Sequence, residues 1–499
     1  MVKLKSRQLV SLLILSAMLT GTLAGCGSDS TPDVTSDANG ETTQEVTETE
    51  ADPRLAISDD LPSVDYDGRT FTVITYEGVK EDIYIESMDG EVVNDAVFSA
   101  RQTVSDRFNV NIDVMTESDY IAVEQTIQNS VLAGDESFQL AAQQVVSLGN
   151  LAVQNLFMNW YDVPHIDFSK PWWSRSMVED LTYKNSSAYI AIGDYALSSL
   201  YNTYCFFYDK DDAEVYKLEN LYDVVWDGRW TVDYLMDITK DMYSDLNGNA
   251  QRDGDDYYGY TQNLKTVMIT WLWACGGKIM EVDSDGVPQL VYHNEHTNAI
   301  VEKIYKLLYE SDGVTTDRDS KYPDSPWHFD VYAFTDGLSM FVNAPLNYAP
   351  SYFRDRDGDY GILPLPKFDE EQEEYYTVVD GAHTAMAVPK SASDVEFIGV
   401  ITEALNAESY RKVFPAYYEV ALKAKYTHDD ESVRMLDLIV DSRIFDFGYV
   451  YDGWKGCSFY FQYLIGDAKS SDFESYYAKN GPASEQYYKS VCESLESIS

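Results

Sequence analysis

The spacing of apolar and polar residues alternates along the first part of the chain between a period of two and a period of three to four. The alternating, β-branched stretch 69–75 predicts a strand. Apolar residues at 93, 97, 100, 104 and 108 share one face of a helix. A strand at 110–114, a helix at 121–132 and a strand at 138–142 follow. This order of elements predicts a parallel sheet with right-handed crossovers, which we assign to a first lobe.

The same pattern continues with elements that we assign to a second lobe. Strands are expected at 189–194 and 205–208, where the chain would cross from the first lobe to the second. Thr231 is the predicted N-cap of a helix whose buried face contains Leu235, Ile238 and Met242. Further helices are expected around 300–308, 395–405 and 433–440. The whole chain is therefore predicted to be α/β.

The stretch 352–390 contains two short apolar runs that each end at proline. Proline fixes φ and donates no hydrogen bond, so such runs are typical of strand ends. A charged excursion at 368–375 separates the two runs. We expect the chain to return here from the second lobe to the first, and an ordinary surface β-hairpin is the alternative that the local pattern leaves open.

These runs also carry a resemblance. The first reads Gly361-Ile362-Leu363-Pro364-Leu365-Pro366-Lys367 and the second ends Ala387-Val388-Pro389-Lys390. Together with 334–341 and 435–443, they resemble the family 1 extracellular solute-binding proteins of clostridial type, over residues 66–499. The resemblance implies a two-lobed periplasmic-binding-protein-like fold (type II), in which each lobe is a mostly parallel sheet flanked by helices and the chain crossovers form a hinge. Lobe 1 would contain 61–201 and 353–425, and lobe 2 would contain 202–352 and 426–499.

The N-terminus has the pattern of an export signal. Lys3, Lys5 and Arg7 precede an apolar run at 9–19 that is too short to span a bilayer as a helix. The run leads into Leu23-Ala24-Gly25-Cys26, which resembles a bacterial lipobox and implies a signal peptide at 1–25 and a lipid on Cys26. A plain signal peptide with a chance cysteine is the alternative. Residues 26–60 are rich in Ser, Thr, Asp and Glu, and we expect them to form a disordered tether.

The charge of the chain excludes some classes of partner. The 499 residues include 36 basic and 84 acidic ones, which gives a net charge of −48. Nucleic acid is excluded because its phosphates require patches of Lys and Arg, and a polybasic membrane surface is excluded too. The membrane is therefore expected to be contacted through the lipid anchor only. Four further cysteines lack any metal-binding spacing and leave open three disulfide pairings or buried free thiols: Cys205, Cys275, Cys457 and Cys492.

An acidic stretch at 245–256 has oxygen-bearing side chains at the spacing of an EF-hand calcium loop. It departs from that pattern at the sixth position, where Ala250 replaces glycine, and at the twelfth, where Asp256 replaces glutamate. A structural calcium is the prediction, and a solvated acidic turn is the alternative. The expected ligands are Asp245, Asn247, Asn249, Gln251, Asp253 and Asp256.

The sequence contains no serine-hydrolase elbow, no phosphate-binding loop and no dinucleotide-binding motif. Aromatic residues are abundant, with 40 Tyr, 20 Phe and 9 Trp. A sugar site needs aromatic platforms with amides and carboxylates, and open α/β sheets bind ligands at strand ends. Most of the aromatic residues are expected in the core. The residues expected to bind ligand follow predicted strands or lie at crossovers: Tyr76, Glu77, Gln143, Gln144, Asp194, Tyr195, Trp271, Trp273, Asn343, Asp380, Gly381, His383 and Trp454.

We therefore expect a receptor, and not an enzyme, that captures a sugar or oligosaccharide between two lobes. The resemblance implies that it delivers this ligand to the permease subunits of an ABC transporter. It would act as a monomer, lipid-anchored at the extracellular face of the cytoplasmic membrane. A surface-anchored glycosidase is one alternative, and a sensor or adhesin with the same fold is another.

Overall fold

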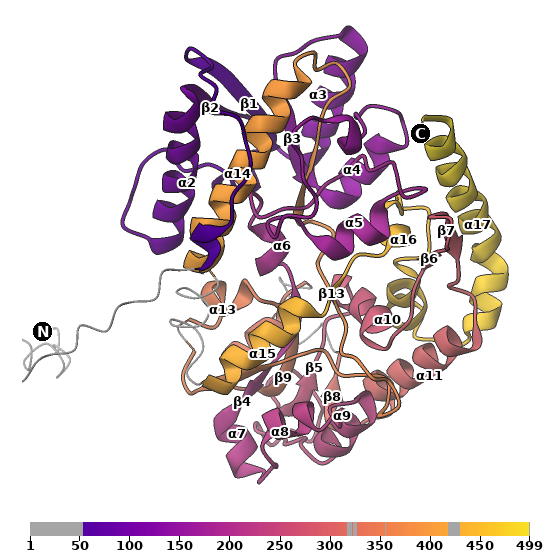
Figure 1. The fold of residues 1–499 in the computed structure, drawn as a ribbon. Helices are drawn as coiled ribbons and strands as arrows, with labels where there is room; N and C mark the ends of the chain where they lie inside the picture. Colours follow the sequence, from indigo (N-terminus) through magenta and orange to yellow (C-terminus); the bar gives the residue numbers. More distant parts are fainter. Residues whose placement is uncertain (1–52, 317–321, 323–326, 355, 418–429, 499) are drawn as a thin grey trace, which may run out of the picture. The chain divides into compact units, whose positions relative to one another are not determined.

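The first sheet comes mainly from the N-terminal part of the chain (Figure 1). The computed structural model describes residues 53–316, 322, 327–354, 356–417 and 430–498. The sheet contains β1 (Arg69–Tyr76), β2 (Val110–Glu117), β3 (Leu140–Gln144) and β12 (Thr384–Ala387), in the order β12-β3-β1-β2. Strand β1 pairs in parallel with both β2 and β3, whereas β12 is antiparallel to β3. The three predicted strands and their parallel pairing are confirmed.

The helices of this part follow the predicted apolar faces. Helix α2 (Val92–Phe108) buries Val97, Ala100, Val104 and Phe108, and it packs against α14 (Val395–Pro415). Asp119 caps α3 (Tyr120–Ala133), and Gly134, with φ of 67°, ends it. The other helices here are α4 (Val145–Ala152), α5 (Arg175–Leu181) and α6 (Ser198–Tyr201), with short 3₁₀ turns at Pro53–Ala56, Glu77–Asp82 and Trp160–Asp162.

The second sheet is mixed. It contains β4 (Tyr204–Asp209), β5 (Tyr258–Thr261), β8 (Val314–Thr315), β9 (Ser339–Pro345) and β10 (Tyr360–Leu363), in the order β10-β4-β9-β5-β8. Strand β4 is antiparallel to β9 and to β10, whereas β5 is parallel to β8 and to β9. Two small sheets complete the set: β11 (Thr377–Val378) with β13 (Arg443–Ile444), and β6 (Met280–Val282) with β7 (Pro288–Leu290).

Helices surround this second sheet and continue to the C-terminus. Thr231 caps α9 by accepting a hydrogen bond from the backbone of Tyr234, as predicted. None of the helices in the described ranges is both long enough and apolar enough to cross a membrane. The helices are α7 (Lys210–Val215), α8 (Leu221–Trp226), α9 (Val232–Thr239), α10 (Thr270–Ala274), α11 (Glu295–Tyr309), α12 (Phe329–Thr335), α13 (Tyr348–Ser351), α15 (Asp430–Asp441), α16 (Phe447–Val450) and α17 (Phe473–Ile498), with a 3₁₀ turn at Thr266–Ile269 and a π-turn at Gln462–Asp467.

The predicted return of the chain lies between β10 and β12. The first apolar run forms β10 in the second sheet, and the second run forms β12 in the first sheet. The two runs pair with different strands and not with each other, so the hairpin alternative is wrong. Because β10 still belongs to the second sheet, the crossing comes after Leu363 and not at the predicted boundary of 353. The predicted boundary between 425 and 426 lies outside the described residues.

One of the two strands predicted at the first crossing is not formed. The stretch 189–194 forms isolated bridges, among them Ala191 with Met386, instead of a strand. The next residue, Tyr195, lies against α14, because the Asn406 side chain accepts a hydrogen bond from its backbone at 3.1 Å. The chain reaches the second sheet after α6, where Thr203 bridges Val379 just before β4.

All four cysteines of the folded part are free. Cys205, Cys275 and Cys457 are buried, and Cys492 is partly buried. Burial raises the pKa of Cys457 to about 12, so its thiol stays protonated at neutral pH. Of the two possibilities left open by the sequence, the structure therefore has free thiols.

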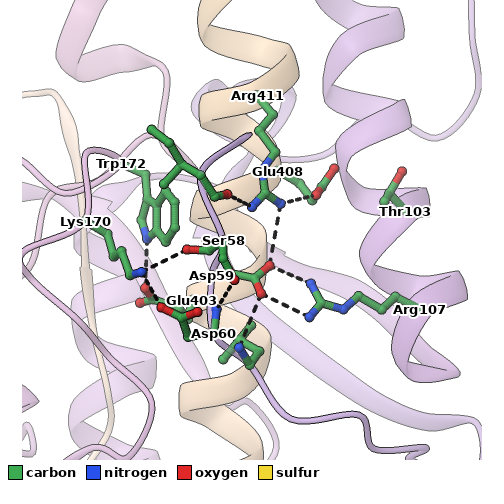
Figure 2. A network of polar contacts seen from close by, with 12 residues as sticks. Ser58, Asp59, Asp60, Thr103, Arg107, Lys170, Trp172, Glu403, Glu408 and Arg411 are labelled. Atoms are coloured by element: carbon green, nitrogen blue, oxygen red, sulfur yellow. Dashed lines mark hydrogen bonds and ion pairs between the residues drawn. The ribbon is translucent and has the colours of Figure 1, made fainter. Parts of the chain in front are cut away.

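The segment 53–61 is held against the folded protein, and we call it the N-terminal strap (Figure 2). Asp59 accepts hydrogen bonds from Arg107 of α2 at 2.5 and 3.0 Å, and Arg411 of α14 lies 3.5 Å from the same carboxylate. Arg411 also donates to the backbone oxygen of Ile57 at 2.6 Å. The segment that was expected to be disordered up to residue 60 is therefore ordered from Pro53 onward.

Beside the strap, a carboxylate is buried in an aromatic environment (Figure 2). Glu403 of α14 is 0% exposed and accepts hydrogen bonds from the indole Nε1 atoms of Trp172 and Trp173, both at 2.9 Å. Burial raises the pKa of Glu403 to about 7. The protein therefore holds a carboxyl group that changes its charge near neutral pH.

Candidate ligand-binding site

Polar side chains gather where β1 and β3 end. Tyr76 is the last residue of β1 and Gln144 the last of β3, and the Gln144 amide donates to the Tyr76 hydroxyl at 3.3 Å. Both side chains are half-buried. Burial raises the pKa of Tyr76, and the nearby charges of Asp82 and Asp380 add to this shift. The end of β1 therefore lies within the electrostatic influence of two carboxylates, Asp82 and Asp380.

Asp380 lies in the return segment and connects both sheets. Its carboxylate accepts hydrogen bonds from the Tyr204 hydroxyl and from the Ala382 backbone, both at 2.9 Å. Tyr204 begins β4 of the second sheet. The Gly381 backbone donates to the Tyr449 hydroxyl at 2.8 Å, and a Cβ atom at position 381 would lie 2.7 Å from that oxygen. This close approach explains why glycine follows the aspartate.

His383 is a neutral, buried residue next to this aspartate. Its Nδ1 donates to the Asp380 backbone oxygen at 2.7 Å, which leaves Nε2 as an acceptor. Nε2 is buried and has no hydrogen-bond partner among the described residues. Burial lowers the pKa of His383 to about 4, so the ring stays neutral at physiological pH.

Further tyrosines and amides border the same region. The Tyr201 hydroxyl donates to the Asp82 carboxylate at 2.5 Å. The Asn347 amide donates to the Asn202 side chain at 3.3 Å, and the Asn347 Oδ1 atom lacks a partner within the described ranges. Burial raises the pKa of Tyr348, and Asp380 is among the charged groups that add to the shift. We call these residues, with Tyr76, Gln144, Tyr204, Asp380 and His383, the Asp380 cluster.

The Asp380 cluster combines the groups that bind sugars in other proteins. Hydroxyl groups of a sugar both donate and accept, and the cluster offers carboxylate acceptors, amides and tyrosine hydroxyls. Tyrosine rings also present apolar faces to the C–H groups of a sugar ring. The residues come from both sheets and from the segment that connects them, so a ligand here would contact both.

Comparison with known proteins finds similarity at the level of the fold. No protein-family model matches the chain, and no curated protein matches its sequence. The galacto-N-biose-/lacto-N-biose I-binding protein of the ABC transporter from Bifidobacterium longum, in complex with lacto-N-biose, has a TM-score of 0.56 at 12% identity, over 87% of this chain and 98% of that one. UspC of M. tuberculosis has a TM-score of 0.54 at 13% identity, over 84% and 100%. The GacH receptor of Streptomyces glaucescens has a TM-score of 0.52 at 11% identity, over 86% and 98%.

The chain has the two-lobed fold of the periplasmic binding proteins. At these identities the similarity establishes the fold and not the ligand. Periplasmic binding proteins close around a ligand by a hinge motion, and α/β sheets bind ligands at their strand ends. The Asp380 cluster contains residues at strand ends and residues in the segments that connect the two sheets. It therefore lies where this fold binds ligands and where its hinge is expected.

Five of the thirteen residues expected to bind ligand lie in or beside the Asp380 cluster: Tyr76, Gln144, Asp380, Gly381 and His383. Glu77 is exposed at the start of a 3₁₀ turn, and Gln143 is buried with its amide on the Tyr120 backbone. Asp194 is half-buried, and burial raises its pKa to about 8. Tyr195 is buried against α14.

The other four lie elsewhere. Trp271 is 0% exposed, and its indole donates to Gln262 within the core. Asn343 is buried in β9 and donates to Thr270 at 2.9 Å. Trp273 is also 0% exposed and lies in the wall of a separate cavity. Trp454 is 64% exposed and stacks on Phe459 with ring centroids 4.8 Å apart. In this conformation Trp271 and Asn343 present no surface to a ligand.

Several members of the Asp380 cluster were missed by the sequence analysis. Asp82, Tyr201, Asn202, Tyr204, Asn347 and Tyr348 belong to it. Ligand-binding residues at the first crossing were expected at Asp194 and Tyr195, whereas the residues of the cluster lie at 201–204, next to the predicted lobe boundary between 201 and 202. The run Tyr201-Asn202-Thr203-Tyr204, directly before a predicted strand, was the available signal.

The acidic loop 245–256 folds through its own hydrogen bonds. Asp245 accepts from the backbone of Gly248 at 2.6 Å and of Ala250 at 2.9 Å, and Asp256 accepts from the Tyr243 hydroxyl at 3.0 Å. Ala250 has φ of 60° and makes the sharp turn that glycine makes in calcium loops. Across the described ranges, no group of three or more His, Cys, Asp or Glu side chains is placed to hold a metal ion. The calcium site therefore stays a prediction from the sequence.

Proposed function

We propose that this protein is the solute-binding receptor of an ABC importer and that its ligand is a sugar or oligosaccharide. The observation that supports this most is the Asp380 cluster, in which the Asp380 carboxylate accepts a hydrogen bond from Tyr204 of the second sheet and its charge acts on Tyr76, whose hydroxyl accepts from Gln144 of the first sheet. Solved proteins of the same fold support it as well, because the Bifidobacterium longum protein binds lacto-N-biose and the GacH receptor binds acarbose. Binding would draw the two lobes together about the connecting segments.

Replacement of Asp380 by asparagine should weaken sugar binding by at least ten-fold, about 1.4 kcal/mol. Asparagine keeps the shape of the side chain and one acceptor oxygen, but it loses the charge that strengthens hydrogen bonds to sugar hydroxyls. The ligand would first be found by thermal shift against a panel of neutral glycans, since binding to the native state raises Tm. Calorimetry on wild type and variant then gives the affinity.

The matched control is Glu373→Gln, which removes a charge from an exposed position in the neighbouring loop and should leave the affinity unchanged. The recovered glycan should be intact on chromatography. Cleaved glycan would favour the glycosidase alternative. Equal affinity of wild type and Asp380→Asn for the glycan would show that the Asp380 cluster is not the binding site.

The same proposal includes an exported lipoprotein anchored through Cys26, a residue outside those the structure describes. Cys26→Ser should shift the protein from the membrane fraction to the soluble fraction after detergent phase separation, because only a thiol can form the thioether to lipid. Cys492→Ser, which changes another cysteine of the chain, serves as the control and should stay with the membranes. Retention of Cys26→Ser in the membrane fraction would contradict the anchor.

A further inference from the structure

A cavity of about 310 Å³ lies beside β13, apart from the Asp380 cluster. Its walls come from α5, from the segment between α10 and β6, from Tyr376 just before β11, and from β13 and the start of α16. No member of the Asp380 cluster is among the described residues that line it. Its volume is at the lower end of the range for small-molecule sites, which suits a ligand of few atoms.

One wall of this cavity carries a firmly held carboxylate. Asp446 accepts hydrogen bonds from the Trp273 indole at 2.9 Å and from the backbone of Ile279 at 2.7 Å through Oδ2. Its Oδ1 atom accepts from Met280 at 3.2 Å and from Gly448 at 2.7 Å. Four donors of this kind hold the side chain in one orientation and favour its charged form, although burial outweighs them and raises the pKa of Asp446.

A second carboxylate lies close to the first. Asp180 of α5 is half-buried, and burial together with the charge of Asp446 raises its pKa to about 6. Lys278 opposes that shift, but its ammonium group bonds Glu281 at 2.9 Å and is 53% exposed. Since Lys278 is the one basic residue among the described lining residues, which include three acidic ones, the walls are negatively charged.

The remaining walls are largely aromatic. Trp273, Tyr376, Phe445 and Phe447 are among the lining residues, and Tyr376 is the least buried of the four, whereas Trp273 is 0% exposed. Aromatic faces attract ammonium groups through the ring quadrupole, and they do so most strongly where water is excluded. Carboxylates next to aromatic walls form an environment that favours an organic cation over a neutral sugar or an anion. A bare metal ion needs oxygen ligands all round, which the aromatic walls do not supply.

We propose that this cavity binds a small alkylammonium cation, whose charge lies between Asp180 and the aromatic rings. The site shares no lining residue with the Asp380 cluster among those described, although the His383 ring packs against Phe445 with centroids 5.7 Å apart. Its occupant would have one or two ammonium groups on a short alkyl chain. Asp180 would supply the principal charge, since Asp446 is already engaged by four protein donors.

The test is calorimetry on the full-length protein with 1,4-diaminobutane and with choline as probes, and with 1,4-butanediol as the neutral counterpart. We expect at least one cation to bind and the diol not to bind. Asp180→Asn should weaken binding of that cation by ten-fold or more, and Tyr376→Leu, which removes a ring but no charge, should weaken it several-fold. Glu179→Gln is the matched control, because Glu179 is the neighbouring acid on α5 but does not line the cavity.

Three outcomes would overturn the proposal: neither cation binds, the diol binds equally well, or both cavity variants bind the cation as the wild type does. Unfolding curves for each variant show that it is folded, and if Asp180→Asn fails to fold, Tyr376→Leu alone decides. If a glycan binds normally while no cation binds, the cation site is refuted and the proposed sugar-receptor function is still supported.

Discussion

Glu403→Gln should become more stable relative to the wild type by about 3 kcal/mol as the pH rises from 4.5 to 8. Folding raises the pKa of Glu403 from 4.5 to about 7, because the buried carboxyl is favoured in its neutral form. The stabilising contribution of the Glu403 carboxyl to the free energy of unfolding is therefore complete below pH 4.5 and is lost as the pH rises through 7. A shift of that size corresponds to roughly 3 kcal/mol at about 1.36 kcal/mol per pH unit. Glutamine has no ionisable proton, so its contribution to stability does not change over this range.

Urea unfolding of both proteins at a series of pH values measures this difference directly. At low pH the variant should be the less stable one, since glutamine offers a single acceptor oxygen to the two indole donors of Trp172 and Trp173. Glu396→Gln is the control, because this residue lies on the same helix with its side chain 72% exposed. If the stability difference for Glu403→Gln were constant with pH, the buried carboxyl would not titrate in this range.

Asp59→Asn should destabilise the protein by about 2–3 kcal/mol. The Asp59 side chain is 7% exposed and meets the side chains of Arg107, which is 37% exposed, and Arg411, which is 13% exposed. Removing the carboxylate leaves the Arg107 guanidinium without its anion, whereas Arg411 keeps Glu408 at 2.7 Å. The partial exposure of Arg107 keeps the loss below that of a fully buried pair. The N-terminal strap should then separate from α2 and α14.

Urea unfolding gives the stability change, and limited proteolysis reports whether the strap has become accessible. The neighbouring Asp60→Asn is the control, because the Asp60 side chain is 71% exposed and its bond to Lys170 should contribute less than about 1 kcal/mol. Equal effects of the two substitutions would mean that Asp59 does not hold the strap through its burial.

The first sheet could be predicted because each of its parallel strands is followed by a helix with a regular apolar face. The return segment could be predicted too, since proline marks the ends of both of its strands. The strand predicted at 189–194 was wrong because this stretch has the apolar character of a strand but forms only isolated bridges, and the backbone of the next residue, Tyr195, donates to the Asn406 side chain. That partner lies more than 200 residues away along the chain, so local pattern gives no sign of it.

The candidate site was predicted only in part, for a related reason. Tryptophan is equally suited to a core and to a sugar platform, and Trp271 is in the core with its indole bonded to Gln262. The N-terminal strap gave only a weak apolar signal in Ile57 and Leu61, and its charged partners Arg107 and Arg411 lie far along the sequence. Residues at strand ends were predicted better, because topology alone determines where they meet.

The pairing of β12 with β3 has a consequence for synthesis on the ribosome. Thr384, which begins β12, is translated about 240 residues after Gln144, the last residue of its partner strand. At about 5–20 residues per second, that delay lasts roughly 12 to 48 seconds. During this time the β3 edge of the nascent sheet has no partner and can pair with other extended chains. A nascent polypeptide of this protein should therefore need a chaperone until its second half has been made.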